Sequence, residues 1–135
     1  MEIHHLDAED VIAVTEEFLT RLGYVPTVLR GGGLALLESA VARAQMAAYY
    51  AQADLFGQAA ALANGIAFND AFVDGNKRSA FAACVTFLRV NNGRPLAANA
   101  HLELAKQLVA LHEMTDRSQA DVLLAEWLRA RAEGQ

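Results

Sequence analysis

The stretch NKRSAFAACVTFLRV, residues 76–90, decides how this chain folds. Beyond its first residues nearly every uncharged position is apolar, and these positions fall on all sides of a helix. A helix at the surface of a protein confines its apolar residues to one stripe, so a helix that is apolar all round belongs inside a domain. The stretch therefore predicts a central, buried helix that begins near Asn76.

The composition of the whole chain favours helices. Of 135 residues, 28 are Ala and 18 are Leu, against 10 Val and 3 Ile. β-Branched residues lose side-chain freedom in a helix, whereas Ala and Leu keep theirs. Hydrophobic residues make up 54% of the chain and charged residues 20%, which excludes a disordered protein and predicts one domain over residues 1–135. The expected fold class is all-α.

Five further helices are expected around the central one, because apolar residues recur there at helical spacing. They are expected over residues 11–22, 34–48, 55–66, 102–109 and 122–128. Asp54 should cap the third helix of the chain, and Ser118 with Asp121 should form a capping box at the last. Residues 24–33, with three consecutive glycines, predict a long flexible connection, and Gly93 predicts a left-handed end to the central helix.

Charge and cysteine content exclude several classes of protein. The net charge is −5, from 11 Lys and Arg against 16 Asp and Glu, so no overall positive field draws the chain to nucleic acid or to an anionic membrane. No apolar run approaches the roughly 20 residues that span a bilayer, and residues 1–5 lack the pattern of a secretory signal. The single cysteine, Cys84, lies among apolar residues, which is typical of a buried thiol. We therefore expect a cytoplasmic protein that binds neither membrane nor nucleic acid.

The start of the central helix has the composition of an anion site. Residues 72–79 place a carboxylate, a glycine, an amide and two cations where helix N–H groups lack partners. Gly75 would let phosphate oxygens approach the backbone, and Lys77 and Arg78 would add positive charge and hydrogen-bond donors. Asp74 is placed to hold Mg²⁺, which usually takes one or two carboxylates together with phosphate oxygens and water. The residues predict a site for nucleotide phosphates and magnesium.

An ordinary helix-capping turn followed by two solvated cations is the alternative interpretation of the same residues. The placement of the cations argues against it, because acids and not bases complement the dipole at a helix start. The chain has only 2 Lys, and Lys77 is one of them. Cations at this position favour a bound anion.

The segment Phe72-x-Asp74-Gly75-Asn76-Lys77-Arg78-Ser79 resembles the core of the Fic/Doc motif, His-Pro-Phe-x-Asp/Glu-Gly-Asn-Lys/Gly-Arg followed by Thr or Ser. The resemblance covers about residues 28–95, and residues 36–43 and 54–93 are similar to the death-on-curing (Doc) branch of that family. An extended motif in a helical context is far more specific than a short pattern. The resemblance implies a compact Fido-type domain of about six helices.

The resemblance also implies roles for individual residues. Asp74 matches the carboxylate that holds Mg²⁺, and Gly75, Asn76, Lys77 and Arg78 match the positions that bind the phosphates of ATP. Fic proteins typically transfer AMP to a hydroxyl of a target protein. Doc-branch toxins are instead associated with transfer of a phosphoryl group to elongation factor Tu, and Lys77 favours this branch. The family resemblance thus implies a toxin that is inhibited by a separate antitoxin protein, with adenylylation as the alternative activity.

One position departs from the motif. The place of its histidine, two residues before Phe72, holds Asp70, and the place of its proline holds Ala71. In the family this histidine takes the proton from the attacking hydroxyl, a role that commonly contributes about 10²–10⁴-fold to the rate. Three interpretations stay open: a substitution that silences a toxin, a natural inactive module that binds an antitoxin, or a variant in which Asp70 is the catalytic base. The first two predict impaired catalysis.

Overall fold

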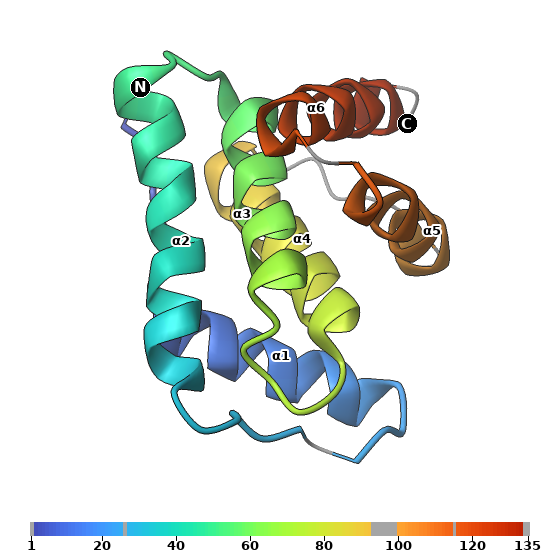
Figure 1. Ribbon diagram of the computed structural model, residues 1–135. Coiled ribbons are helices and arrows are strands. Elements are labelled where there is room, and N and C mark those ends of the chain that lie inside the picture. Colours follow the sequence, from blue (N-terminus) through green and yellow to red (C-terminus); the bar gives the residue numbers. More distant parts are fainter. Residues whose placement is uncertain (1, 26, 93–99, 115, 134–135) are drawn as a thin grey trace.

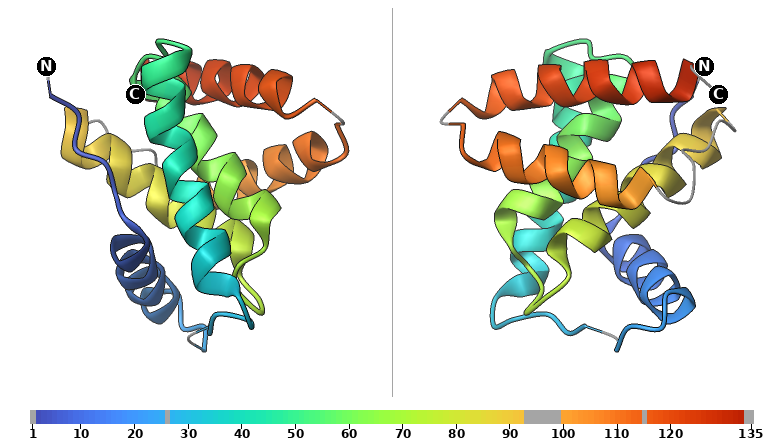
Figure 2. Two further views of the ribbon diagram at one scale, coloured as in Figure 1. Left: turned by 60° about the vertical axis from the view of Figure 1, so that its left-hand side comes forward. Right: turned by 90° about the vertical axis from the view of Figure 1, so that its right-hand side faces the viewer.

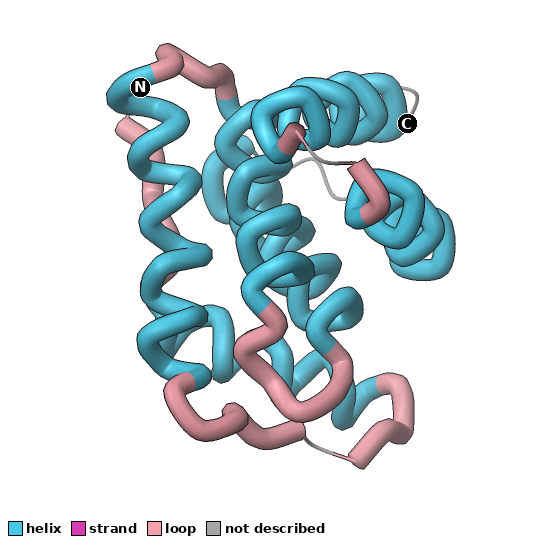
Figure 3. Tube along the Cα trace, in the orientation of Figure 1, coloured by secondary structure: helices cyan, strands magenta, loops and turns pink. Residues whose placement is uncertain are grey.

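The structure is a computed structural model that describes residues 2–25, 27–92, 100–114 and 116–133. These residues form helices and no strand (Figure 3). The helices are α1 (Ala8–Arg21), α2 (Gly33–Tyr50), α3 (Leu55–Asn69), α4 (Asn76–Asn92), α5 (Ala100–His112) and α6 (Arg117–Glu133). The prediction of an all-α fold of about six helices is confirmed. None of the helices in the described part of the chain is both long and apolar enough to cross a bilayer.

Helices α3 and α4 pack against each other at the centre of the molecule (Figure 1). Helix α2 lies along one side of α3, α6 covers another side of α3, and α1 crosses α4 (Figure 2). All residues from 58 to 67 in α3 and from 79 to 85 in α4 are buried. The prediction of a buried helix beginning at Asn76 is confirmed, and α3 shares the central position with it.

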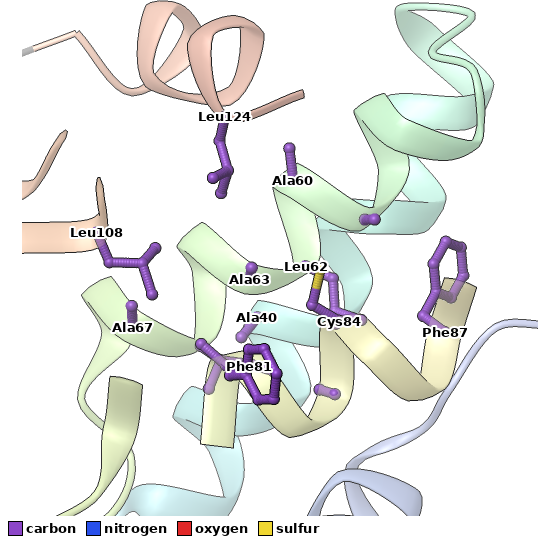
Figure 4. Packing of buried hydrophobic residues seen from close by; sticks show 14 of the residues in the cluster. Ala40, Ala60, Leu62, Ala63, Ala67, Phe81, Cys84, Phe87, Leu108 and Leu124 are labelled. Atoms are coloured by element: carbon purple, nitrogen blue, oxygen red, sulfur yellow. The ribbon is translucent and has the colours of Figure 1, made fainter. Parts of the chain in front are cut away.

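Small side chains in α3 allow the helices to approach closely. A Cβ atom at Gly65 would lie 3.1 Å from the backbone oxygen of Ala40 in α2, closer than ordinary van der Waals contact. Larger side chains of α3 and of the surrounding helices fill the remaining space, among them Leu62, Phe81, Leu108 and Leu124 (Figure 4). The abundance of Ala in the sequence therefore serves close helix packing as well as helix formation.

Cys84 lies inside this core, as the apolar sequence around it predicted (Figure 4). Its side chain is fully buried, and burial raises the pKa of the thiol to about 12 because the thiolate would lose its hydration. Cys84 is therefore a small hydrophobic residue of the core and not a reactive thiol.

The helix ends predicted from the sequence have different outcomes. The Asp54 carboxylate accepts the backbone N–H of Gly57 at 2.8 Å, which confirms the cap of α3. The capping box of Ser118 and Asp121 is wrong, because Asp116 precedes α6 and accepts a backbone N–H of its first turn at 3.3 Å. The predicted left-handed residue Gly93 lies outside the described residues.

Asp121 contacts other helices instead of its own N-terminus. Its two carboxylate oxygens accept hydrogen bonds of 2.7 Å from the Arg43 guanidinium of α2 and from the Asn64 amide of α3. Asn64 is fully buried, and the side chains of Arg43 and Asp121 are 23% and 24% exposed. Hydrogen bonds to charged groups are stronger than neutral ones, so these tertiary partners outweigh a local cap.

The connection between α1 and α2 is held against the loop between α3 and α4, at the lower end of the molecule in Figure 1. Leu29 and Phe72 form an antiparallel bridge, and the Arg30 N–H donates to the Ala71 carbonyl at 3.0 Å. A Cβ atom at Gly33 would lie 2.3 Å from that same carbonyl oxygen. The expected flexible connection is thus anchored by hydrogen bonds at its C-terminal half, and glycine lets the first turn of α2 lie against the loop.

Candidate functional site

The site loop, defined here as residues 70–75, joins α3 to α4 through two left-handed residues. Asp70 has φ 58° and ψ 45°, and Gly75 has φ 77°. Asp tolerates this region of backbone space better than most residues, and glycine adopts it freely. A Cβ atom at Gly75 would meet nothing closer than 4.0 Å, so this glycine is required by the backbone conformation and not by packing.

Asn76, at the first position of α4, braces the site loop. Its side chain is 9% exposed, and its Nδ2 donates to Asp70 Oδ1 at 2.7 Å and to the Phe72 carbonyl at 3.0 Å. Its Oδ1 accepts the Phe72 N–H at 3.0 Å. Both ends of the amide are therefore used within the loop, and the expected contact of Asn76 with phosphate would fall to its backbone N–H at the helix start.

A cavity of about 350 Å³ lies at the start of α4 and has the size of a small-molecule site. The structure brings all the residues that the sequence predicted for the site into its lining: Asp70, Asp74, Gly75, Asn76, Lys77 and Arg78. Residues that the sequence analysis did not name complete the walls. They include Tyr24, which follows α1, and Leu102 of α5.

Asp74 offers a carboxylate to this cavity. Its Oδ1 accepts the Gly75 N–H at 2.8 Å, and the Thr27 hydroxyl donates to its backbone carbonyl at 2.7 Å. Its Oδ2 receives no hydrogen bond from the described residues. One exposed carboxylate oxygen beside two cations is a donor set that fits Mg²⁺ held jointly with phosphate oxygens.

The Arg78 guanidinium stacks on an aromatic ring. Its Cζ lies 3.9 Å from the centre of the Tyr24 ring, within the range of a cation–π interaction. No carboxylate among the described residues lies within ion-pair distance of it. The positive charge of Arg78 is therefore not compensated by an ion pair with any described residue.

The Asp70 carboxylate has an arginine partner that the sequence did not reveal. Arg30 Nη2 lies 3.0 Å from Asp70 Oδ2, while Asp70 Oδ1 accepts the Asn76 amide. Each oxygen of Asp70 thus already accepts a hydrogen bond, and a substrate hydroxyl would compete for the remaining lone pairs. The only local signal for Arg30 is a charged residue directly before three glycines, and Tyr24 has no local signal at all.

The chain is similar to proteins of a known family. The profile described as Fic/DOC family matches residues 5–88, a span that contains the site loop and most of α4. A protein named "Toxin Doc" from Mycolicibacterium smegmatis (strain ATCC 700084 / mc(2)155) is 39% identical over 112 residues, which cover 78% of this chain and 77% of that protein. The chain belongs to the Fic/Doc family.

Membership of the Fic/Doc family gives the contacts of the site loop a chemical meaning. By resemblance to the family motif, Asp70 is expected at the position of the histidine that accepts a proton. Here that position is occupied by a shorter side chain that is paired with Arg30 and Asn76. Lys77 and Arg78, which line the same cavity, form no ion pair with an acid among the described residues.

Proposed function

We propose that this Fic/Doc protein is the toxin of a toxin–antitoxin pair and that it binds ATP with Mg²⁺ in the cavity at the start of α4. The proposed reaction is transfer of a phosphoryl group to a protein hydroxyl, with a substrate of the elongation factor Tu class in the cytoplasm. The observation that carries the proposal is the convergence of Asp74, Lys77 and Arg78 on one helix N-terminus in one cavity. The similarity to a protein named Toxin Doc supports the same class of function.

Each residue has a separate task in this proposal. Backbone N–H groups at the start of α4 and the side chains of Lys77 and Arg78 would bind phosphate oxygens and orient the nucleotide. Asp74 would hold Mg²⁺, which supplies charge neutralisation on the transferred phosphoryl group when bound. Gly75 leaves the backbone open to the phosphates, because it carries no side chain and has open space around its Cα.

We further propose that catalysis is impaired at Asp70. A general base must reach the proton that it abstracts, and both oxygens of Asp70 accept hydrogen bonds from Arg30 and Asn76. The variant in which Asp70 acts as the base remains an alternative, as does an inactive module that binds nucleotide and an antitoxin without transferring anything. Transfer of AMP is the second candidate reaction, and Lys77 favours phosphoryl transfer over it.

The test is label transfer to elongation factor Tu from γ-³²P-ATP and, separately, from α-³²P-ATP. Asp70→His should raise transfer by about 10²–10⁴-fold over the unmodified protein, with little change in nucleotide affinity. The left-handed backbone at position 70 admits histidine, which is enriched there as Asn and Asp are. The label that appears on the protein distinguishes phosphorylation from adenylylation.

The control is Asp70→Asn, which keeps the shape of the side chain and removes its charge. A fall in activity in both variants would identify Asp70 as a working base and contradict the impairment. Nucleotide binding by Asp70→His with no transfer would favour the inactive module. Absence of nucleotide binding in every variant would overturn the proposed function.

A second groove, of about 420 Å³, lies between α1 and α4 and fits the proposed antitoxin. Its apolar lining consists of Val14, Phe18, Leu22, Phe81, Ala82 and Val85. Arg21 also lines it but is paired with Glu17 at 2.6 Å, whereas Arg89 has no ion pair among the described residues. The apolar lining and Arg89 favour a partner segment with an apolar face and an acidic residue. Thr86→Arg, within this lining, should weaken binding of the antitoxin encoded by the neighbouring gene and leave nucleotide affinity unchanged. Equal antitoxin binding by both proteins would exclude the groove.

A further inference from the structure

Tyr24 is placed by the end of α1 and not by the site itself. The Tyr24 N–H donates to the Leu19 carbonyl at 2.9 Å, and the preceding Gly23, with φ 79°, donates to the Thr20 carbonyl at 3.1 Å. This is the hydrogen-bonded turn, with glycine in the left-handed region, that commonly ends a helix. The turn fixes the backbone of Tyr24 at the edge of the cavity, where its ring stays 44% exposed.

The first turn of α4 is tied to α1 by a pair of buried hydroxyls. Ser79 and Thr15 are 0% and 1% exposed, and their hydroxyl oxygens lie 2.6 Å apart. Thr15 donates its own proton to the Val11 carbonyl, so Ser79 donates to Thr15. Since Ser79 directly follows Arg78, this contact sets the distance between the arginine and the helix that carries Tyr24.

Stacking leaves the guanidinium free for an anion. The Cζ atom of Arg78 lies over the Tyr24 ring, 3.9 Å from the ring centre. The five N–H donors of arginine lie in the plane of the group, so an aromatic partner on its face does not use them. A carboxylate partner would use these donors and cancel the charge, as Asp70 does for Arg30.

From these contacts we infer that Tyr24 is a positioning residue that holds Arg78 in the orientation needed to bind nucleotide phosphate. The inference rests on the proposed nucleotide site. A stacked guanidinium has less side-chain freedom to lose on binding than a free one, so the aromatic ring raises phosphate affinity without touching the phosphate. Its role is separate from the anion-binding role of Arg78 itself.

The experiment is calorimetric titration of the full chain with Mg²⁺–ATP. Tyr24→Leu should weaken binding by about two- to fivefold, the size of a cation–π interaction at an exposed site, while Tyr24→Phe should restore the affinity of the unmodified protein. Tyr24→Trp, with a larger ring face, should bind at least as tightly. In an Arg78→Ala background, Tyr24→Leu should cause no further loss, because the ring acts through the arginine.

Three results would overturn the inference while nucleotide binding stands. They are unchanged affinity in Tyr24→Leu, equal weakening in Tyr24→Phe and Tyr24→Leu, and a full additional loss in the Arg78→Ala background. If the unmodified protein binds no nucleotide, the proposed function and the positioning role fall together. Tyr24 is exposed, so the substitutions should fold, and unchanged circular dichroism and melting temperature would check this. If Tyr24→Leu does not fold, Tyr24→Gln, which also lacks an aromatic face, replaces it with the same expected loss, and unchanged affinity would overturn the inference.

Discussion

Two arginines flank the site loop, and their partners give them opposite properties. Arg30 faces the Asp70 carboxylate at 3.0 Å, whereas Arg78 faces the ring of Tyr24 at 3.9 Å. The side chains of Arg30 and Asp70 are 45% and 55% exposed, and exposed ion pairs contribute only about 0–1 kcal/mol to stability. The neighbour of an arginine therefore decides whether its charge is available to an anionic ligand. A carboxylate neighbour compensates the charge, whereas an aromatic neighbour leaves it uncompensated.

The largest effect expected from this difference is on nucleotide affinity. Arg78→Ala should weaken Mg²⁺–ATP binding by about 1.5–3 kcal/mol, the range for a hydrogen bond to a charged group, at an unchanged melting temperature. Arg30→Ala is the matched control, and its effect should be several-fold smaller because its charge is already paired with Asp70. Titration calorimetry on the two variants measures both values. Equal losses would remove the distinction between the arginines.

The next largest effect is expected on stability, at Asn76, whose amide holds the site loop in place. Asn76→Ala removes three hydrogen bonds and leaves the N–H of the buried Phe72 without its partner, which should lower the free energy of unfolding by about 1–3 kcal/mol. Asn91 is the control, since its amide also makes three hydrogen bonds, two of them with the backbone of His4, at a more exposed place.

Urea unfolding of Asn76→Ala and Asn91→Ala compares the two amides directly. We expect the smaller loss at Asn91, because water can replace its partners there. A loss at Asn76 no larger than that at Asn91 would show that the site loop holds its shape without the brace.

The smallest expected effect is on stability, at an ion pair outside the site that can be compared with the pair of Arg30 and Asp70. Arg129 Nη2 lies 2.6 Å from Asp54 Oδ2. Partial burial opposes ionisation of Asp54, but the Gly57 N–H and the Arg129 guanidinium together lower its pKa below the ordinary value of 3.8. Because folding lowers this pKa, the stabilisation is complete above about pH 4 and is lost as the pH falls through the lowered value.

Asp54→Asn keeps a side-chain oxygen that can cap α3 and removes the charge, so it removes the ion pair with Arg129 and the charge assistance of the Gly57 hydrogen bond. At neutral pH the variant should be less stable than the unmodified protein by about 0.2–1 kcal/mol, and this difference should vanish in acid. Urea unfolding at neutral pH and below pH 3.8 measures it. A difference that persists unchanged in acid would show that Arg129 does not act through the charge of Asp54.

The sequence predicted the helices and the anion-site residues because both depend on local patterns. Apolar spacing located the six helices, and residues 70–78 are contiguous, so the helix start and the cations could be seen together. Binding of ATP and Mg²⁺ stays a prediction. The family and the all-α fold are confirmed.

The missed features depend on contacts between segments that are distant in sequence. Tyr24 and Arg30 reach the site only because the connection between α1 and α2 pairs with the site loop. The position of Asp121, three residues after Ser118, predicts a local cap, yet its partners lie on α2 and α3. The ion pair of Arg30 and the hydrogen bonds of Asp121 join segments that are distant in the chain. Such contacts leave no local pattern in a single sequence.

The bridge between Leu29 and Phe72 joins two segments that are made at different times during synthesis. A ribosome delivers the chain from its N-terminus, so Tyr24 and residues 27–30 emerge long before the loop with which they pair. The cavity gains the walls formed by Leu102 and Ala105 only after the motif itself has been made. A nascent chain interrupted before α5 therefore carries the whole motif but lacks a complete pocket. In a protein proposed to be a toxin, this ordering delays the complete pocket until α5 has been made.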